Sequence, residues 1–268
     1  MQPRILPLLL LAGLGTTPAL AQNALAVPEE DDGWSGLVAL GPGATPEYEG
    51  ADSYRLIPFA IADVRREGIA FQMRGLRARL ALGSGGLVAG PVVNMRLSRD
   101  DDVGGSVSRM AKIDSAVELG GFVGYRFGGD ARGQGEVQLD LTDLFDASDT
   151  HDGFLLVASA SYAALRADRF SLSVDAQTTY GDKKYTRTYF GVTPADSAAS
   201  GLAAYRPGAS LRDVGVGGTL GYRFDDHWGL LGRLSYTLLV GDAADSPVVR
   251  DAGSRHQGQA GLALSYRF

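Results

Sequence analysis

Residues 256–268, HQGQAGLALSYRF, alternate between two kinds of side chain. One set is mainly apolar, and the other set is polar or very small. The apolar set is Gly258, Ala260, Leu262, Leu264, Tyr266 and Phe268, and the other is Gln257, Gln259, Gly261, Ala263, Ser265 and Arg267. A period of two residues is typical of a β-strand that places one face in apolar surroundings.

The same alternation returns in the stretches GEVQLDLTD, RFSLSVDAQTTYG and DHWGLLGRLSYTLLVG. These stretches are longer than the five or six residues that are usual for a strand in a soluble protein. A strand that crosses a bilayer at a tilt of about 45° needs roughly 9 to 11 residues. The strand lengths therefore favour an all-β transmembrane barrel over a soluble β-sandwich.

The tripeptide Tyr-Arg-Phe ends three of the predicted strands, at residues 125–127, 222–224 and 266–268. Aromatic side chains gather at the two membrane interfaces of an outer-membrane barrel, so we expect each pair of rings to face lipid. The arginine between them then points into the lumen. A phenylalanine at Phe268, after an alternating strand, also resembles the signal that the barrel assembly machinery reads.

Counting alternating segments predicts an antiparallel barrel of twelve strands, which is an even number, as single-chain bacterial barrels have. We expect the strands near residues 33–42, 53–64, 67–74, 75–82, 86–98, 113–127, 132–143, 153–165, 169–181, 211–224, 227–241 and 256–268. Long outer loops then fall at 43–52, 99–112, 144–152, 182–210 and 242–255, and short turns join the strands on the periplasmic side. Ten strands are the alternative, because the third and fourth strands are short and Pro91 removes a ladder donor from the fifth.

The first residues have the features of an export signal. Residues 1–21 hold an early cation, an apolar run and the small residues Ala19 and Ala21, so we expect a signal peptide that is cleaved after Ala21. Residues 22–32 would then form a periplasmic segment, and residues 33–268 the barrel. This organisation predicts the outer membrane of a Gram-negative bacterium as the location.

Composition argues against several classes of function. The chain has no cysteine, which excludes thiolate catalysis and cysteine-ligated metals, and its net charge of -6 argues against nucleic acid as a partner. Its histidines, His151, His227 and His256, belong to no recognised serine hydrolase or zinc motif. We therefore expect no enzyme activity, no catalytic, cofactor-binding or metal-binding residues and no cofactor.

Two acidic stretches are candidate loops for Ca²⁺. The second lacks the ligand spacing of a calcium loop, and solvated surface charge is the favoured interpretation of these stretches. They contain Asp100, Asp101 and Asp102 in the first case and Asp143, Asp146, Asp149 and Asp152 in the second. Other charges are expected inside the lumen: Glu118, Glu136, Asp140, Asp175, Arg77, Arg79, Arg126, Arg223, Arg233 and Arg267. Paired, they would make a plug, which we favour; the alternative is a narrow polar channel.

Several short motifs together resemble the MipA/OmpV family of outer-membrane proteins, the MltA-interacting proteins. They are PEYEG at 46–50, YFGV at 189–192, SGL at 200–202, GDAADSPVV at 241–249 and the final YRF. The resemblance implies a non-enzymatic barrel that acts as a scaffold between a lytic transglycosylase and a murein synthase. The alternative functions are a narrow channel for small solutes or antibiotics and a surface adhesin. The resemblance implies no ligand-binding residues in this chain.

Overall fold

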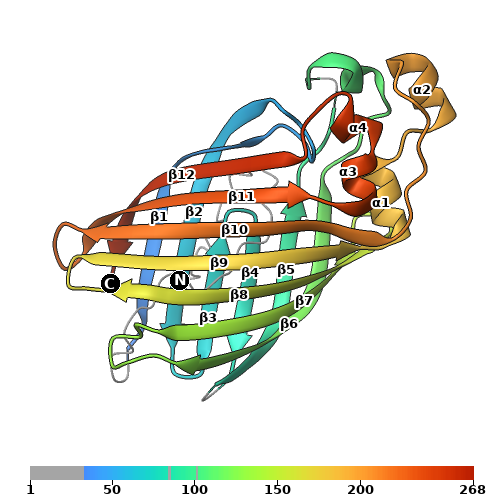
Figure 1. Ribbon diagram of the computed structural model, residues 1–268. Helices are drawn as coiled ribbons and strands as arrows, with labels where there is room; N and C mark the ends of the chain where they lie inside the picture. The colour runs from blue at the N-terminus through green and yellow to red at the C-terminus, as the bar shows by residue number, and fades with distance from the viewer. Residues whose placement is uncertain (1–32, 84–85, 101) are drawn as a thin grey trace, which may run out of the picture.

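The computed structural model of the chain describes residues 33–83, 86–100 and 102–268, so the predicted signal peptide and the segment 22–32 lie outside the described residues. Antiparallel strands form one closed barrel, which confirms both the fold class and the expected number of twelve (Figure 1). The strands are β1 (Ser35–Pro46), β2 (Tyr54–Arg66), β3 (Ile69–Arg74), β4 (Arg77–Leu82), β5 (Leu87–Arg96), β6 (Ala116–Gly128), β7 (Glu136–Asp146), β8 (Phe154–Arg166), β9 (Phe170–Gly181), β10 (Ser210–Arg223), β11 (Trp228–Leu239) and β12 (His256–Arg267).

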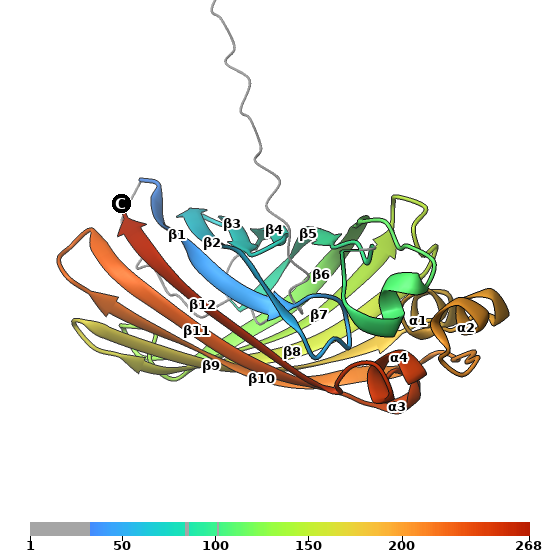
Figure 2. The ribbon, with the colours of Figure 1, turned by 90° about the horizontal axis from the view of Figure 1, so that it is seen from above.

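Each strand pairs with its neighbours in sequence, and β1 pairs with β12 to close the sheet. At this seam Leu37 lies opposite Arg267 and Leu40 opposite Leu264. An even number of strands brings both ends of the barrel chain to one rim. Figures 1 and 2 show Phe268 at that rim and the helices of the long loops at the opposite rim, which is the extracellular side of an outer-membrane barrel.

Several strand ends differ from the sequence-based prediction by a few residues. The largest corrections are of four residues. Residues 132–135, which we predicted to begin a strand, lie in the turn before β7. Residues 43–46, which we predicted to be outer loop, belong to β1, since the ladder with β2 continues to the pair Pro46 and Tyr54. Likewise β7 continues to Asp146, beyond the expected end at residue 143. In both cases the backbone ladder extends past the last regular apolar residue, so side-chain alternation underestimates the strand.

Pro91 lies in β5 where the sheet can spare a hydrogen bond. The described ladder between β4 and β5 is interrupted there, between the pairs Arg79 with Val92 and Leu82 with Ala89. A proline in a strand is tolerated at such an interruption because it has no N–H to donate. The short strands β3 and β4 both exist, so the alternative of ten strands is wrong.

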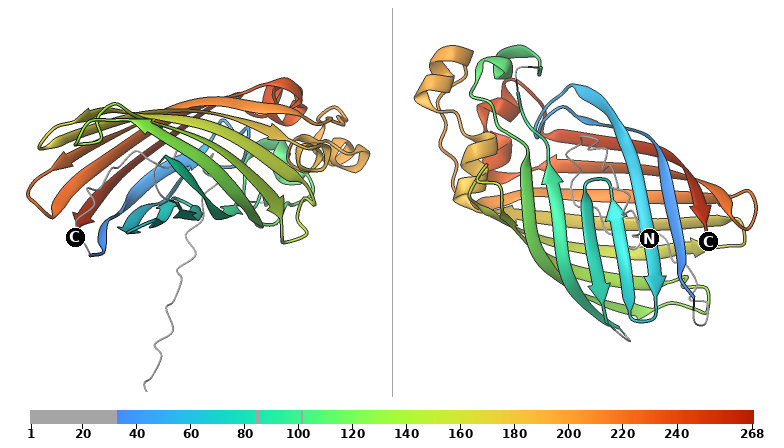
Figure 3. Two further views of the ribbon diagram at one scale, coloured as in Figure 1. Left: turned by 90° about the horizontal axis from the view of Figure 1, so that it is seen from below. Right: turned by 180° about the vertical axis from the view of Figure 1, so that it is seen from behind.

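The β3–β4 hairpin is much shorter than its neighbours, as the cyan hairpin in Figure 3 shows. The ladder between β2 and β3 starts only at Ile61, opposite Arg74. Residues 54–60 of β2 therefore pair with β1 on one side and with no described strand on the other. The barrel wall therefore extends less far toward the extracellular side at the β3–β4 hairpin than at the neighbouring strands.

The outer loops contain the short helices η1 (Gly105–Arg109), α1 (Lys183–Phe190), α2 (Pro194–Ser200), α3 (Gly241–Asp245) and α4 (Pro247–Arg250). Among the described residues, no helix has both the length and the apolar character needed to cross a membrane. The sequence predicts the 182–210 and 242–255 segments as loops only, whereas in the structure their helices pack them into an ordered cap. Buried side chains join the loops to one another: Tyr48, Ala51, Val103, Val107, Met110, Val192, Leu202 and Val248.

The outer face of the barrel is apolar, as a lipid-facing surface must be. Leu56 and Leu234 have 83% and 69% of their surface exposed, and aromatic rings cluster at both rims. At the periplasmic rim Tyr266 lies between Trp228 and Phe268, at ring separations of 5.0 Å and 6.4 Å. The expected lipid-facing girdle of Tyr-Arg-Phe motifs is therefore present.

Candidate functional site: the lumen of the barrel

The outer end of the lumen is filled by a set of ionic and aromatic side chains that we call the outer cluster. Its members come from strands and loops on all sides of the barrel: Glu49 from the β1–β2 loop, Arg96 from β5, Glu118 from β6, His151 from the β7–β8 loop, Tyr185 from α1 and Arg212 from β10. Arg96, Glu118, His151, Tyr185 and Arg212 are all less than 10% exposed. The cluster therefore ties the loops to the barrel wall across the lumen.

Glu49 is the centre of the outer cluster. Its carboxylate pairs with the guanidinium groups of Arg96 and Arg212, with a distance of 3.1 Å to Arg212 Nη1. The hydroxyl of Tyr185 donates to Glu49 Oε2 at 2.5 Å and accepts from Arg212 Nη1 at 2.6 Å. A single loop carboxylate thus connects two strands from different sides of the barrel.

Glu118 is the second carboxylate of the outer cluster and is fully buried. It accepts from Arg96 Nε at 2.9 Å and from Asn94 Nδ2 at 2.7 Å, and His151 Nε2 lies 3.1 Å from it. Since the N–H of Gly153 donates to His151 Nδ1 at 3.1 Å, the proton of a neutral His151 ring is on Nε2 and points at Glu118. Every buried charge here has an opposite charge or a donor, as burial requires.

A β-bulge in β10 brings Arg212 into the outer cluster. The register between β9 and β10 shifts between Leu211 and Asp213, so that the neighbours Arg212 and Asp213 are both buried on the lumen side. Arg212 Nε donates to Asp213 Oδ2 at 2.5 Å. The extra residue of a β-bulge changes the direction of a side chain, so that it can point to the other face of the sheet.

The aromatic rings of α1 lie against the cations. Arg96 stacks over the ring of Tyr185 at 4.9 Å and over that of Tyr189 at 5.4 Å. Desolvation raises the pKa of the Tyr185 hydroxyl well above its ordinary value, so it stays protonated and able to donate. Glu49 has the opposite balance: burial would raise the pKa of its carboxyl, but Arg212, Arg96 and the Tyr185 hydroxyl outweigh burial and lower it.

The cavity next to Glu49 and Arg212 of the outer cluster is small, with a volume of about 40 Å³. Below it, predicted lumen charges pair as expected: Asp175 with Arg233 at 2.9 Å and Asp140 with Arg79 at 3.5 Å. These pairs favour the plug over the open channel.

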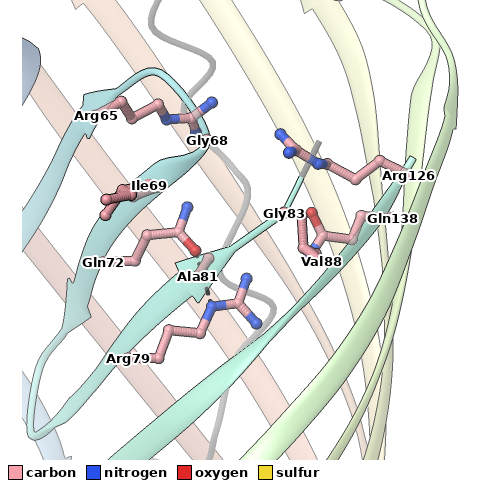
Figure 4. A pocket seen from close by; sticks show the side chains of 11 residues that line it. Arg65, Gly68, Ile69, Gln72, Arg79, Ala81, Gly83, Val88, Arg126 and Gln138 are labelled. Atoms are coloured by element: carbon pink, nitrogen blue, oxygen red, sulfur yellow. Dashed lines mark hydrogen bonds between the residues drawn. The ribbon is translucent and has the colours of Figure 1, made fainter. Parts of the chain in front are cut away.

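A second small cavity of about 50 Å³ lies nearer the periplasm, between β3–β4 and β6–β7 (Figure 4). Arg79 Nε donates to Gln72 Oε1 at 2.8 Å on one wall, while Arg126 and Gln138 approach from the other. Arg126 thus points inward from its Tyr-Arg-Phe motif, as we expected. Arg77 contacts Asn94 Oδ1 at 3.3 Å rather than a carboxylate.

The periplasmic end of the lumen holds a larger cavity, of about 350 Å³, which we call the vestibule. Its polar lining is dominated by arginine: Arg132, Arg166, Arg169, Arg223 and Arg267. The predicted lumen residues Arg223 and Arg267 therefore meet here, whereas Glu136 forms no ion pair within the described part of the chain. The lumen is consequently packed at its outer end and roomy at its periplasmic end.

Asp146 has a structural role, while Asp101 of the first acidic stretch lies outside the described residues. Asp146, from the second acidic stretch, accepts from the backbone N–H groups of Ser148 and Asp152 at 2.9 Å and 2.8 Å and shapes its loop. In residues 33–83, 86–100 and 102–268 no group of histidines and acids could hold a metal ion. His256 Nδ1 lies 2.6 Å from the hydroxyl of Tyr236, and its ring makes no bond to the hydroxyl of Ser254.

Alternation identified Glu118 but missed Glu49, Arg96, Arg212 and the contact of His151. Glu49 lies in a loop, where the alternation of a strand cannot predict which way a side chain points. Its motif PEYEG was noted only as part of the family resemblance. Arg212 was hidden by the bulge, because a register shift breaks the alternation that would have placed it. Side chains that meet across a lumen from distant loops leave no local signal in a sequence.

A closed antiparallel barrel with an apolar outer face, aromatic rims and a polar, ion-paired interior is an outer-membrane protein of a Gram-negative bacterium. The family model of MltA-interacting protein MipA matches residues 38–268. The chain therefore belongs to the MipA family, in agreement with the resemblance in its loop motifs.

A relative from Vibrio anguillarum, outer membrane protein Omp26La, is 31% identical over 93 residues, which is 35% of this chain and 34% of the relative. The match thus spans about a third of that protein's length. Among solved structures, an outer-membrane channel of Pseudomonas putida F1 has a TM-score of 0.46 at 11% identity, over 95% of this chain and 100% of that one. OmpT of Vibrio cholerae has a TM-score of 0.39 at 9% identity, over 91% and 100%. Similarity at this level supports no conclusion about function.

Proposed function

We propose that this barrel is a non-enzymatic interaction protein that helps to position murein-processing enzymes at the outer membrane. The observation that carries the proposal is the asymmetry of the lumen. The outer cluster fills the extracellular end, while the vestibule of about 350 Å³ opens at the periplasmic rim. A barrel built in this way is suited to contacts in the periplasm, where murein lies. The name of the family, MltA-interacting protein, supports a lytic transglycosylase as the partner.

The contact surface must then be periplasmic. On that side the longest described turn joins β6 to β7, and Asp130 Oδ1 orders it by accepting from the N–H groups of Arg132 and Gln134 at 2.8 Å and 3.0 Å. Arg132 also pairs with Asp168 of the next periplasmic turn at 2.9 Å. Together with residues 22–32, these turns form the surface that we expect a periplasmic enzyme to bind.

Crosslinking followed by pull-down from cell envelopes tests the proposal. We expect a lytic transglycosylase, and with it a murein synthase, to be recovered with the wild-type protein. Recovery should fall when residues 22–32 are replaced by a Gly/Ser sequence of equal length, or when Arg132 is changed to Glu. Arg250→Glu is the matched control, because Arg250 lies in α4 on the extracellular side.

Two outcomes would contradict the scaffold. A strain lacking the protein that shows altered uptake of small solutes or antibiotics, with no transglycosylase recovered, would favour the narrow channel. Capture of an external ligand by the ordered 182–210 loop would favour a surface adhesin. Assembly through the barrel assembly machinery, with Phe268 as the recognised residue, belongs to the same proposal and is tested separately below.

A further inference from the structure

The vestibule has a marked excess of positive charge. Among the described residues that line it, Asp168 is the only acid beside Arg132, Arg166, Arg169, Arg223 and Arg267. The Asp168 carboxylate pairs with Arg132 at 2.9 Å, and its backbone carbonyl accepts from Arg223. One acid therefore faces several guanidinium groups.

Three of these arginines lack an acidic partner. Within the described part of the chain, Arg169, Arg223 and Arg267 form no ion pair, and Arg267 Nε is buried without a hydrogen-bond partner. The outer cluster is built differently, because Arg96 and Arg212 each pair with a carboxylate there. Arg223 and Arg267 are half-buried, whereas Arg169 is exposed. A half-buried guanidinium without a counter-charge is unfavourable, which points to an anion that the described residues do not supply at this place.

Hydroxyl groups lie beside the arginines. Ser171 and Ser265 line the same cavity, together with Gly221 and Gly229, which carry no side chain. The vestibule thus combines guanidinium and hydroxyl donors in one cavity.

We propose that the vestibule binds a soluble periplasmic anion that carries several carboxylate or phosphate groups, held by Arg223 and Arg267, with the exposed Arg169 at the edge of the site. Guanidinium groups bind both kinds of oxyanion through paired N–H donors. A lipid headgroup would offer the same chemistry, but Arg223 and Arg267 lie on the lumen side, opposite the lipid-facing rings of Phe224 and Phe268. The proposal rests on the periplasmic orientation in the proposed function, but not on the murein partner.

Titration calorimetry on the detergent-purified full chain tests the site, with pyrophosphate and citrate as probes. We expect both probes to bind and the affinity to fall as salt is raised. The double variant Arg223→Gln/Arg267→Gln should bind at least tenfold more weakly, while Arg223→Lys/Arg267→Lys should keep part of the affinity. Arg250→Gln, which removes an exposed arginine at the outer end, should bind like wild type. Heat-modifiable migration in gels shows that each variant has folded.

Equal affinities for the double variant and the Arg250→Gln control would overturn the proposal. Residues 29–32, Glu-Glu-Asp-Asp, could compete for the arginines, so the titration is repeated with these four residues changed to their amides. An absence of binding in both forms would also overturn it. Binding that appears only in nanodiscs of anionic lipid would assign the arginines to headgroups and would refute the soluble anion. None of these results depends on recovery of a transglycosylase, so the two proposals can fail independently.

Discussion

At the scale of single residues, Phe268 completes the barrel wall. Its N–H donates to the Gly36 carbonyl at 3.0 Å, and the Gly36 N–H donates to the Phe268 carbonyl at 2.9 Å. Its ring lies directly over Gly36, where a Cβ would stand only 2.6 Å from it. Phe268 is therefore a structural part of the seam between β1 and β12 as well as a lipid-facing ring of the periplasmic girdle.

Deleting Phe268 should strongly reduce the amount of assembled barrel in the outer membrane. The deletion removes two backbone hydrogen bonds at the closing seam together with the ring that we expect the assembly machinery to recognise. Outer-membrane fractionation and heat-modifiable migration measure the yield. Phe154→Ala, at the outer girdle beside Phe145, is the control and should assemble nearly normally. Equal yields for the deletion and the wild type would refute the assembly role.

Glu49→Gln should destabilise the outer cluster, because Arg96 and Arg212 lose the carboxylate that both contact. Loss of one partner from a buried ion pair costs roughly 3 kcal/mol, which we expect in the free energy of unfolding measured in urea. Glu47→Gln is the matched control in the same loop, since Glu47 accepts a hydrogen bond from Ser53 rather than from an arginine. An equal effect of the two changes would show that Glu49 has no special role.

The same carboxylate predicts a pH dependence. The arginines hold the pKa of Glu49 below its ordinary value of 4.5, so its contribution is complete above the unfolded pKa and is lost as the pH falls through the lower, folded pKa. Wild-type stability should therefore drop below about pH 4, and Glu49→Gln should show a smaller drop. Urea titrations between pH 3 and pH 7 measure both, and identical pH profiles would contradict the prediction.

At the scale of elements, α1 carries the side chains that cap the lumen. Asp182 begins this helix by accepting from the Tyr185 N–H at 3.0 Å, and the same oxygen accepts from Phe154 N–H at 3.2 Å. Thr193 and Asp196 form a reciprocal capping box at the start of α2. These caps explain how a loop as long as 182–210 holds Tyr185 in a defined position.

Asp182→Ala should loosen α1 without unfolding the barrel. Loss of a helix cap costs about 1 kcal/mol, so the 182–210 loop should be cut faster by limited proteolysis. Lys183→Ala, next to the cap and exposed, is the control. Faster cleavage in the 242–255 loop instead would mean that the cap acts on α3 and α4 rather than on α1.

At the scale of the whole molecule, the distribution of charge separates the two ends of the lumen. Carboxylates and arginines are matched in the outer cluster and in the pairs below it, while arginines are in excess in the vestibule. A path for ions would have to pass Glu49, Tyr185 and Arg212 at the packed end. We therefore expect the lumen to be plugged at its outer end, above a periplasmic pocket.

Planar-bilayer recordings should show no steady conductance for the wild-type protein. The double variant Glu49→Ala/Tyr185→Ala removes the two side chains that connect Arg96 with Arg212, so it should conduct intermittently. Tyr236→Ala, which changes an exposed, lipid-facing tyrosine of β11, should behave like wild type. A steady wild-type current that changes when Asp175 or Arg233 is neutralised would show that the lumen is an open channel.

The amino-acid sequence by itself determined the barrel, its twelve strands and its lipid-facing side. Those properties depend on local alternation: Leu262, Leu264, Tyr266 and Phe268 must share a face in any extended strand, whatever surrounds them. The lumen position of Glu118, Asp140 and Asp175 follows from the same rule. The orientation of Arg126, Arg223 and Arg267 does too, because each stands between two lipid-facing aromatics.

Only the tertiary structure decided what those inward charges do. Whether Glu49 meets Arg96 and Arg212 depends on how a loop folds back over the lumen and on a bulge in β10, and neither has a local periodicity. The helices of the outer loops likewise depend on packing against one another. Closure of the barrel brings residues more than a hundred positions apart into contact, and this long-range step gives the lumen one packed end and one open, arginine-lined end.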